Sequence, residues 1–299
     1  MSRSPVSVII PTRRRPEYLR RAIDSVYVQS SPPAEILVVD DNADDDRARA
    51  ATHDVLHECR ADCPAAITLR EEVAPAALGG AAARNLGAER AVGDYLAFLD
   101  DDDWWLPQKL ELQMEVFAAA PEAGLVYTAR RIVGPSGEAK RTRSAEHRGW
   151  IADVLLAENV IGTTSCAMVR RDVFEEVGGF DASLPARQDV DLWLRVARAY
   201  PIEVVAEAVT VQQEHDEGRI SRRFDAKSAG LEMFLHKHYS EIATRPSVLA
   251  AHCLRIGTHY LKYGRPLRGR RWLLRALRAR PTLRAFRRFV FGVRGGGRR

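Results

Sequence analysis

Several common signals are missing from this 299-residue chain. No apolar run reaches the roughly 18 residues that a membrane-spanning helix needs, so no spanning helix is predicted. The apolar run at residues 6–10 has only five residues and leads into Pro11 and three arginines, which is unlike a secretion signal. We therefore expect a cytoplasmic protein.

Cysteine is scarce as well. The four cysteines are Cys59, Cys63, Cys166 and Cys253, with one close pair and no second pair or histidine to complete a zinc pattern. Free, buried thiols are the expected state. With 46% hydrophobic and 28% charged residues, the composition is otherwise that of an ordinary globular protein.

Acidic residues are absent from one end of the chain. Residues 242–299 contain sixteen Lys or Arg and no Asp or Glu, which leaves 29 basic and all 40 acidic residues in the first 241. The net charge of +5 therefore conceals an acidic region and a strongly basic one. We expect these two regions to face different partners.

The first hundred residues alternate between two hydrophobic periods. Short β-branched or aromatic runs predict buried strands, and apolar residues at helical spacing predict helices between them. The expected strands are 6–10, 35–39, 67–69 and 95–99, and the expected helices are 16–29, 44–59 and 81–91. This alternation predicts an α/β protein with a mainly parallel, doubly wound sheet flanked by helices.

Polar clusters follow three of these strands. Pro11, Thr12 and Arg13 follow the first, Asp40 and Asp41 the second, and residues 100–103 the fourth. Ligands of such sheets bind beyond the carboxyl ends of the strands, so we expect the clusters to share one crevice. The first strand is followed by PTRRRPEY, without glycine, so the dinucleotide-binding fingerprint is missing. A nucleotide site of another design is indicated.

The cluster at 100–103 is four consecutive aspartates, followed by Trp104 and Trp105. Adjacent carboxylates beside a buried strand repel one another unless a cation or hydrogen-bond donors hold them. Their hard oxygen ligands suit magnesium or manganese. An acidic turn that caps the next helix is the simpler interpretation, but capping requires only one Asp. We therefore favour a metal or nucleotide site.

Several ordered motifs resemble glycosyltransferase family 2, whose members have the GT-A fold. They are VSVIIPTRRRPEYLRRAIDSV, EILVVDDNADD, GGAAARNLG, GDYLAFLDDDDWWLPQKLE, VGGFD and QDVDLWLR, and the resemblance covers about residues 5–222. It implies a GT-A domain with a Rossmann-like nucleotide-binding sheet over residues 1–222. Residues 223–299 are then a basic α-helical C-terminal extension.

The resemblance also implies how a nucleotide is held. Pro11 and Thr12 lie against the base through their backbone, Asp40 accepts a hydrogen bond from the base, and Asp100 contacts the ribose. An ionised carboxylate only accepts hydrogen bonds, which suits the N–H groups of uracil or guanine. Arg84 has two interpretations, a contact with the diphosphate or base and a surface helix arginine.

For the metal, Mn²⁺ or Mg²⁺, the family's D-x-D signature maps onto Asp100 and Asp102, with Asp102 as the ligand. A one-residue shift within the four aspartates stays open. His215 matches the position where relatives supply a second metal ligand. Asp103 is interpreted as a helix cap.

For the acceptor, the motif QDVDLWLR offers Asp189 as the catalytic base. Relatives often carry Glu-Asp here, whereas this chain has Gln188 before Asp189, which removes one means of raising the pKa of the base. Asp191 is interpreted as a helix cap or an ion-pair partner. A single base predicts direct displacement at the anomeric carbon with inversion.

The implied function is metal-dependent transfer from a UDP- or GDP-sugar to a glycan or lipid-linked acceptor, as in surface polysaccharide synthesis. The alternative is a non-catalytic protein of the same fold, held at a membrane by its basic region. Arginines around an apolar stripe suit an anionic inner membrane face as well as a solvated helical cap. Sparse aromatic interleaving argues against nucleic acid.

Overall fold

The structure is a computed structural model that describes residues 5–214 and 224–292. The chain divides into two compact units. The first comprises Met1–Leu155, Asn159–Ala182 and Asp189–Asp216, and the second comprises Leu156–Glu158, Ser183–Gln188 and Glu217–Arg299. The boundary at residue 222 stays a prediction, because it falls outside the described residues.

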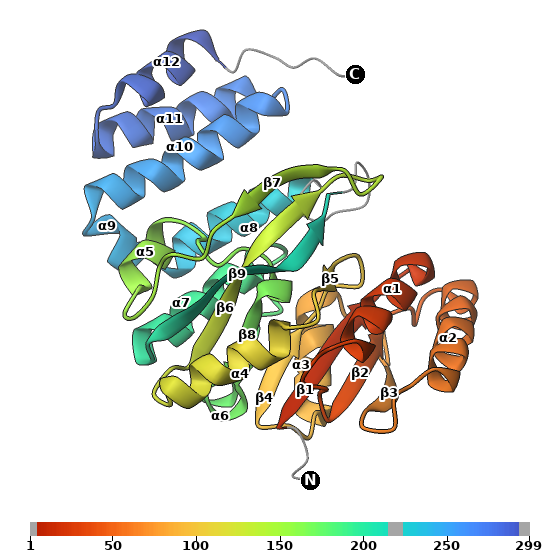
Figure 1. The fold of residues 1–299 in the computed structure, drawn as a ribbon. Coiled ribbons are helices and arrows are strands. Elements are labelled where there is room, and N and C mark those ends of the chain that lie inside the picture. Colours follow the sequence, from red (N-terminus) through yellow and green to blue (C-terminus); the bar gives the residue numbers. More distant parts are fainter. Residues whose placement is uncertain (1–4, 215–223, 293–299) are drawn as a thin grey trace. The chain divides into compact units, whose positions relative to one another are not determined.

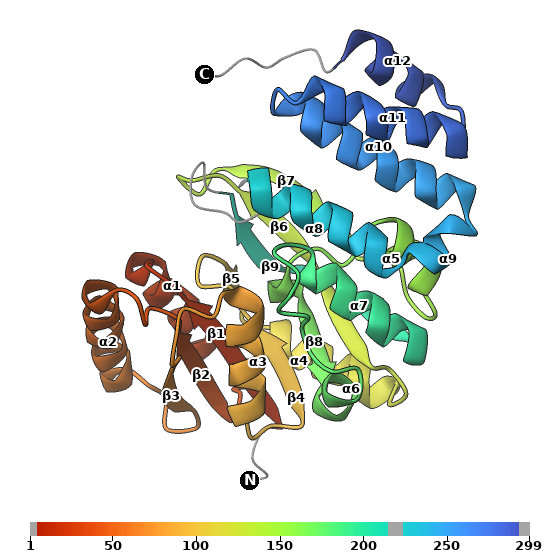
Figure 2. The same cartoon turned by 180° about the vertical axis from the view of Figure 1, so that it is seen from behind.

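One mixed sheet organises the first unit. Its strand order is β3-β2-β1-β4-β8-β6-β9-β5, and β7 pairs with β6 outside this path. The strands are β1 (Val6–Thr12), β2 (Glu35–Asp40), β3 (Thr68–Val73), β4 (Tyr95–Phe98), β5 (Trp104–Trp105), β6 (Leu125–Val133), β7 (Ala139–Arg143), β8 (Ala167–Arg170) and β9 (Ile202–Gln213). The α/β fold with helices on both faces of the sheet is confirmed (Figures 1 and 2).

The first four strands are parallel, as the alternation predicts. Strand β1 differs from the prediction, because it continues through Pro11 to Thr12 instead of ending at Pro11. The pairing explains why. Strand β4 accompanies β1 only as far as Ile9, so Pro11 lies where β1 is paired with β2 alone. A missing backbone N–H is tolerated at a position that is paired on one side.

The later strands add antiparallel pairs. Strand β8 is antiparallel to both β4 and β6, and β5 is antiparallel to β9. Strand β9 is a single long strand, parallel to β6 with a register shift between Thr128 and Arg130. The pairing of β5 with β9 brings the segment behind the four aspartates to the sheet.

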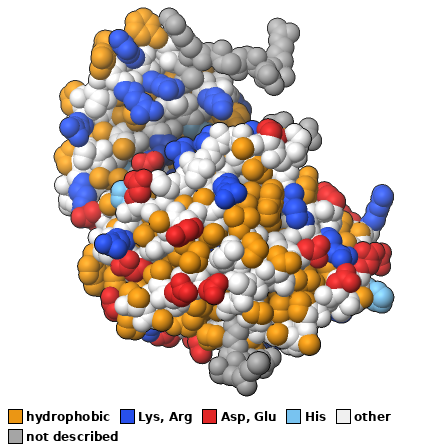
Figure 3. Space-filling view, viewed as in Figure 1, with side chains coloured by type: hydrophobic (Ala, Val, Ile, Leu, Met, Phe, Trp, Pro, Cys, Tyr) orange, Lys and Arg blue, Asp and Glu red, His pale blue; other side chains and the backbone are white. Residues whose placement is uncertain are grey.

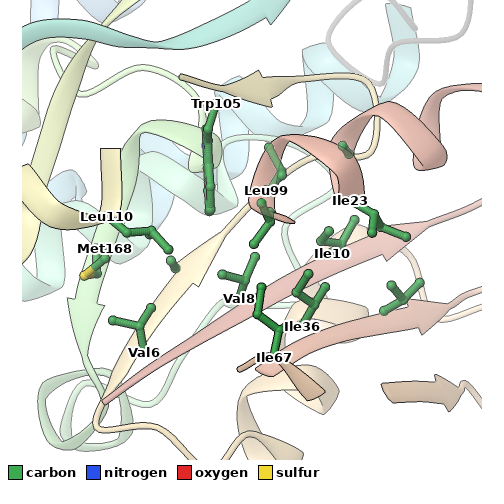
Figure 4. Packing of buried hydrophobic residues seen from close by; sticks show 14 of the residues in the cluster. Val6, Val8, Ile10, Ile23, Ile36, Ile67, Leu99, Trp105, Leu110 and Met168 are labelled. Carbon is green, nitrogen blue, oxygen red and sulfur yellow. The ribbon is translucent and has the colours of Figure 1, made fainter. Parts of the chain in front are cut away.

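The helices of the first unit lie on opposite faces of the sheet. Alternating side chains of β1 and β2 meet α1 and α2 on one face, and Figure 4 shows Val8, Ile10, Ile23 and Ile36 packed there. The helices are α1 (Pro16–Tyr27), α2 (Asp46–Ala61), α3 (Gly80–Arg90), α4 (Lys109–Ala119), α5 (Ala152–Ala157), α6 (Arg171–Glu176) and α7 (Gln188–Ala199), with the short 3-10 helix η1 (Thr164–Cys166). The C-terminal end of α5 and Gln188, the first residue of α7, belong to the second unit.

Helix α3 covers the other face of β1 and β2 at short range. A Cβ at Gly87 would lie 2.5 Å from a methyl group of Ile9 and 3.0 Å from one of Val39. The small residues of GAAARNLGA therefore let the helix approach the sheet closely. This approach places the adjacent Arg84 and Asn85 beside the carboxyl ends of the strands.

The second unit is helical, in agreement with the α-helical C-terminal extension that the sequence predicts. They are α8 (Phe224–Lys237), α9 (Tyr239–Ala243), α10 (Pro246–Lys262), α11 (Pro266–Ala279) and α12 (Leu283–Phe291). Helices α10 and α11 pack closely, because a Cβ at Gly257 would meet the carbonyl oxygen of Gly269 at 2.9 Å.

Candidate active site

The four aspartates form a turn between β4 and β5, and their side chains point to different partners. Asp101, Asp102 and Asp103 are buried, and Asp100 is half-buried. The turn is closed by a hydrogen bond from the N–H of Asp103 to the carbonyl of Asp100. Such a concentration of buried carboxylates requires donors from elsewhere in the chain.

Asp101 is held by the end of β1 and by Arg15, the residue that precedes α1. Its carboxylate accepts a hydrogen bond from the hydroxyl of Thr12 at 2.9 Å and lies 2.7 Å from the guanidinium of Arg15. Burial raises the pKa of Asp101 to about 7, although Arg15 opposes the shift. Asp101 therefore connects the acidic turn to the end of β1.

Asp100 is surrounded by donors. Arg84 forms an ion pair with its carboxylate, and the hydroxyls of Thr163 and Thr164 donate to it at 3.1 and 2.9 Å. Burial would raise the pKa of Asp100, but Arg84 and the two hydroxyls outweigh burial and lower it. Arg84 is thus a partner of the D-x-D segment and not a surface arginine.

Asp102 and Asp103 complete a cluster with Asp100. The three residues each offer one carboxylate oxygen, and these oxygens lie within 4.8 Å of one another. Arg15 pairs with Asp102 at 2.8 Å. Asp103 accepts hydrogen bonds from the hydroxyl of Ser165 and the backbone N–H of Gln213. The interpretation of Asp103 as a helix cap is wrong, because α4 begins after Gln108 and Asp103 faces the sheet instead.

The nucleotide-binding residues proposed from the first two strands lie at the same edge. Thr12 pairs with Asp40 in the sheet, and the N–H of Asp41 donates to the carbonyl of Thr12. Asp40 is buried and accepts two hydrogen bonds from Asn42, both on Oδ1, at 2.8 and 2.7 Å. Burial raises its pKa, and the bonds from Asn42 partly oppose this. Pro11 precedes Thr12 in β1 and is half-buried.

Asp41 anchors the loop before α3. Its two carboxylate oxygens accept from the backbone N–H groups of Leu78 and Gly79. This contact fixes the start of α3, which carries Arg84. The second cluster of acids therefore helps to position a residue that pairs with the third.

Asn85 fastens the GGFD loop to α3. Its side-chain amide donates to the carbonyl of Phe180 at 2.8 Å and accepts from the N–H of Phe180 at 2.9 Å. Gly179 has a φ of +63°, and a Cβ there would lie 2.9 Å from the Asn85 side chain. Glycine is therefore needed at this position. The motif AARN places an arginine on the acids and an asparagine on this loop.

Asp189, the proposed base, lies in the first turn of α7. It accepts a hydrogen bond from the side-chain amide of Asn159 at 3.1 Å. Asn159 also donates to the carbonyl of Gly162 and accepts from its N–H, which fixes the loop that leads into Thr163 and Thr164. Asp189 and Asp100 are thus joined through one short loop.

Asp191 behaves as the sequence suggested. It is fully buried and forms an ion pair with Arg195 one turn along α7, at 2.8 Å. Arg195 also donates to the carbonyl oxygens of Val177 and Gly179. The assignment of Asp191 to a structural ion pair is confirmed.

Gln188 and His215 are the remaining residues that the sequence analysis discussed for the site. The side chain of Gln188 donates to the carbonyl of Leu184 at 2.7 Å, a contact within its own segment. His215, predicted as a metal ligand, lies outside the described residues.

The two tryptophans have packing roles. Trp105 is buried and donates from its indole N–H to the carbonyl of Ser165 at 2.9 Å. Trp104 lies beneath the guanidinium of Arg21, whose centre is 4.0 Å from the ring centroid. The tryptophans thus support the turn and its partner η1.

A hollow of about 310 Å³ occurs elsewhere in the first unit, lined by Asn85, Ala88, Glu89, Phe174, Glu175, Gly178 and Gly179. It contains none of the four aspartates. The candidate site is therefore the group of side chains around the acidic turn and not this hollow.

The residues that satisfy the acids are not predicted from the sequence. Arg15 stands in a basic run, and Thr163, Thr164, Ser165 and Asn159 belong to none of the motifs that indicate the site. The only signal was a run of three hydroxyl residues after Gly162. Such a run is ordinary in loops, so the structure was needed to interpret it.

The α/β sheet with an acidic turn at its strand ends resembles solved structures of glycosyltransferases. The first is the mannosyltransferase PcManGT from Pyrobaculum calidifontis in complex with GDP-Man and Mn²⁺, with a TM-score of 0.63, 19% identity and coverage of 98% of this chain and 80% of that one. The second is S. aureus TarS in complex with UDP-GlcNAc, with a TM-score of 0.61, 15% identity and coverage of 95% and 91%. At these identities the likeness shows the fold, which is GT-A.

The family follows from sequence. The sequence model of the family described as "Glycosyl transferase family 2" matches residues 7–178, which is more than half of the chain. The chain therefore belongs to this family. An uncharacterised glycosyltransferase of Haemophilus influenzae is 27% identical over 64% of this chain and 61% of its own length. TuaG of Bacillus subtilis, named for teichuronic acid biosynthesis, is 30% identical over 64% of this chain and 72% of its own length. The chain spans less than two thirds of the former.

Proposed function

We propose that the protein transfers a sugar from a nucleoside diphosphate sugar to an acceptor hydroxyl, with a divalent cation and inversion at the anomeric carbon. The observation that carries this proposal is the convergence of Thr12, Asp40 and the acidic turn at one edge of the sheet. Ligands of open α/β sheets bind at this edge. Membership of the family supports the reaction class.

Asp40 is proposed to hold the base. Both hydrogen bonds from Asn42 end on Oδ1, so Oδ2 is the acceptor for a base N–H. Pro11 and Thr12, at the end of β1, would lie against the base through their backbone. Uracil and guanine both offer suitable N–H groups, in agreement with the UDP-GlcNAc and GDP-Man bound to the two similar structures.

The acidic turn fits a divalent cation. Asp100, Asp102 and Asp103 form an all-oxygen donor set within 4.8 Å, and such hard ligands are those of Mg²⁺ and Mn²⁺. Asp102 is the proposed principal ligand, with Asp100 against the ribose and Asp103 as a further candidate. When bound, the cation would neutralise the charge that develops on the departing diphosphate. His215 remains a proposed ligand from the sequence.

Arginines complete the electrostatics of the leaving-group site. Arg15 and Arg84 pair with Asp102 and Asp100, so the turn is already partly neutralised. A guanidinium group can bind the oxygens of a phosphate in the same way as it binds those of a carboxylate. Arg84 is therefore proposed to exchange part of its contact with Asp100 for the diphosphate of the donor.

Asp189 is the proposed base. Its carboxylate would take the proton of the acceptor hydroxyl as that oxygen attacks the anomeric carbon. The bond from this carbon to the diphosphate oxygen then breaks on the opposite side, which inverts the configuration. Asn159 holds Asp189 by its side chain, so the carboxylate keeps one orientation.

The acceptor is proposed to be a glycan or a lipid-linked glycan, in surface polysaccharide or related glycoconjugate synthesis. The name of the Bacillus subtilis relative supports this class. Location in the cytoplasm, with peripheral contact at the inner membrane face, also stays a proposal.

Donor screening tests the proposal. The purified chain is incubated with UDP- and GDP-sugars, with Mn²⁺ or EDTA, and release of UDP or GDP is measured by mass spectrometry. We expect metal-dependent release from at least one donor and NMR evidence of an inverted product when an acceptor is supplied. Binding of a nucleotide without turnover under any condition would favour the alternative, a non-catalytic binding protein of the same fold.

A further inference from the structure

Helix α12 exposes an apolar stripe. Leu283 and Phe286 are 66% and 52% exposed, and Val290 is also exposed. These positions are spaced i, i+3 and i+7, so they lie on one face of the helix. Ala285, on the other side, is the residue of α12 that is buried. Three large apolar side chains of α12 therefore face solvent, whereas Ala285 faces the protein.

Helix α11 shows a similar inversion. Its leucines have different environments. Leu273 is buried within the second unit, whereas Leu267 and Leu274, seven residues apart, are exposed. Two successive helices thus expose leucine and phenylalanine side chains.

Arginines surround these apolar positions. Arg284 and Arg287 are exposed on α12, and Arg270, Arg271 and Arg278 are exposed on α11. No acidic residue occurs after residue 241. At the top of Figure 3, this region shows blue and orange side chains beside one another. A surface that is both apolar and uniformly cationic is unusual for a solvated helical cap.

We propose that α11 and α12 form a docking surface for an anionic lipid bilayer. Uniform positive charge opposes pairing with a second copy of the same surface. Nucleic acid would satisfy the arginines but would leave the exposed leucines and phenylalanine in water. A bilayer satisfies both, since lipid phosphates pair with arginine heads while apolar side chains enter the acyl region.

The geometry is that of helices lying in the plane of the interface. Within the described ranges 5–214 and 224–292, no helix has both the length and the apolar character to cross a bilayer. Helix α12 has nine residues, enough for two and a half turns along the surface. Leu283, Phe286 and Val290 insert between the headgroups, and Arg284 and Arg287 remain at the level of the phosphates.

Vesicle flotation with the full chain tests this surface. We compare neutral phosphatidylcholine vesicles with vesicles that also contain phosphatidylglycerol, at low and high salt. Binding is expected to the anionic vesicles and to weaken at high salt, because exposed charges are screened. Replacing both arginines in R284Q/R287Q should lower the partition coefficient about 30-fold, from about 1 kcal/mol for each basic residue.

The apolar variant L283Q/F286Q should lower the partition coefficient at least about tenfold without changing net charge. Its matched control is V28Q/V92Q, because Val28 and Val92 are 60% and 56% exposed on the first unit. The control for charge is R143Q/R148Q, at two exposed arginines of the first unit. Both controls should bind vesicles within about threefold of the wild type. Circular dichroism confirms that each variant is folded.

Several results would overturn the proposal. One is equal binding of L283Q/F286Q and wild type to anionic vesicles. Another is a dimer in light scattering that L283Q/F286Q dissociates, which would assign the surface to self-association. Binding to duplex DNA that depends on Arg284 and Arg287 but not on Phe286, without vesicle binding, would assign it to nucleic acid.

Discussion

The acidic turn and the basic helices use charge in opposite ways. In the turn, four carboxylates are gathered at one point, and each meets guanidinium, hydroxyl or backbone donors from distant segments. In α11 and α12, the arginines are spread over exposed surface in a region without acidic residues. Concentrated and satisfied charge is typical of a site for a small ligand. Positive charge that is spread over an exposed surface is typical of contact with a large polyanionic surface.

The two regions also differ in how strongly they depend on contacts between distant parts of the sequence. The turn depends on contacts between residues as far apart as Thr12 and Asp101, or Asp103 and Gln213. The basic surface involves only residues of α11 and α12, two helices that follow one another in the sequence. Variants in the turn should therefore affect chemistry and stability strongly, whereas variants in the helices should affect association with a partner.

The largest effect is expected at the acidic turn itself. D102A should lower kcat/KM for transfer by about 10³-fold or more, because a principal ligand of the cation is removed. Steady-state kinetics over a range of Mn²⁺ concentrations measures this. The control is D54N, at an exposed aspartate of α2. Equal activity of D102A and D54N would remove the turn from the mechanism.

Two neighbouring aspartates of α7 should respond differently. D189N should bind donor normally but lose about 10²–10⁴-fold in kcat, because the proposed base can no longer accept a proton. D191N should instead cost roughly 3 kcal/mol of unfolding free energy, because Arg195 would lose its buried partner. Kinetics and chemical denaturation of both variants distinguish the two roles. If D189N turns over like the wild type, the base is another group.

A variant of Asn159 should affect both donor binding and the chemical step. It holds both Asp189 and the loop that carries Thr163 and Thr164 to Asp100. We therefore expect N159A to lower kcat by about 10–100-fold and also to weaken donor binding, because small displacements of catalytic groups are costly. Calorimetry of nucleotide binding beside kinetics separates the two effects. A loss in kcat alone would mean that Asn159 serves only Asp189.

The smallest effect is expected at Lys109, a buried charged residue that has no role in the proposed reaction. Lys109 is fully buried, its ammonium lies 3.7 Å from the centroid of the Trp105 ring, and its Nζ has no hydrogen-bond partner among the residues that the structure describes. Burial lowers its pKa from 10.5 to about 7. K109M should therefore raise the unfolding free energy at pH 7 by about 2 kcal/mol.

The pH dependence has a definite sign. The pKa of Lys109 is lower in the folded protein, so the cost of its burial is full below pH 7 and disappears as the pH rises to about 10.5. The stability difference between K109M and wild type should shrink over this window. Urea denaturation at pH 7 and pH 10 measures it, with K140M at an exposed lysine as the control. A difference that does not change with pH would contradict the assigned titration.

Periodicity predicted the framework of the fold well. Buried runs such as EILVV and amphipathic helices such as α1 are encoded by neighbouring residues, so their order and approximate bounds followed from the sequence. The course of β1 through Pro11 did not, because it depends on where the neighbouring strand β4 ends. The single strand β9 likewise depends on its pairing with β6.

Part of the site could be predicted from the sequence, because some of its residues directly follow strands that the sequence predicts. Thr12, Asp40, Asp100 and Asp102 stand at strand ends, and the structure brings them to one edge of the sheet. Arg84 joins them through its ion pair with Asp100. The hydroxyls of Thr163 and Thr164 were missed, because more than 60 residues separate them from their partner. Contacts of that separation have no local signature.

The central claim is that the strand ends bind a nucleoside diphosphate and a divalent cation together. Electron paramagnetic resonance of Mn²⁺, titrated with protein in the presence and absence of UDP or GDP, measures this most directly. We expect one of the nucleotides to tighten Mn²⁺ binding by at least about tenfold in the wild type and to have no such effect in D102A. Mn²⁺ binding that is unchanged by either nucleotide, or equally strong in D102A, would contradict the account.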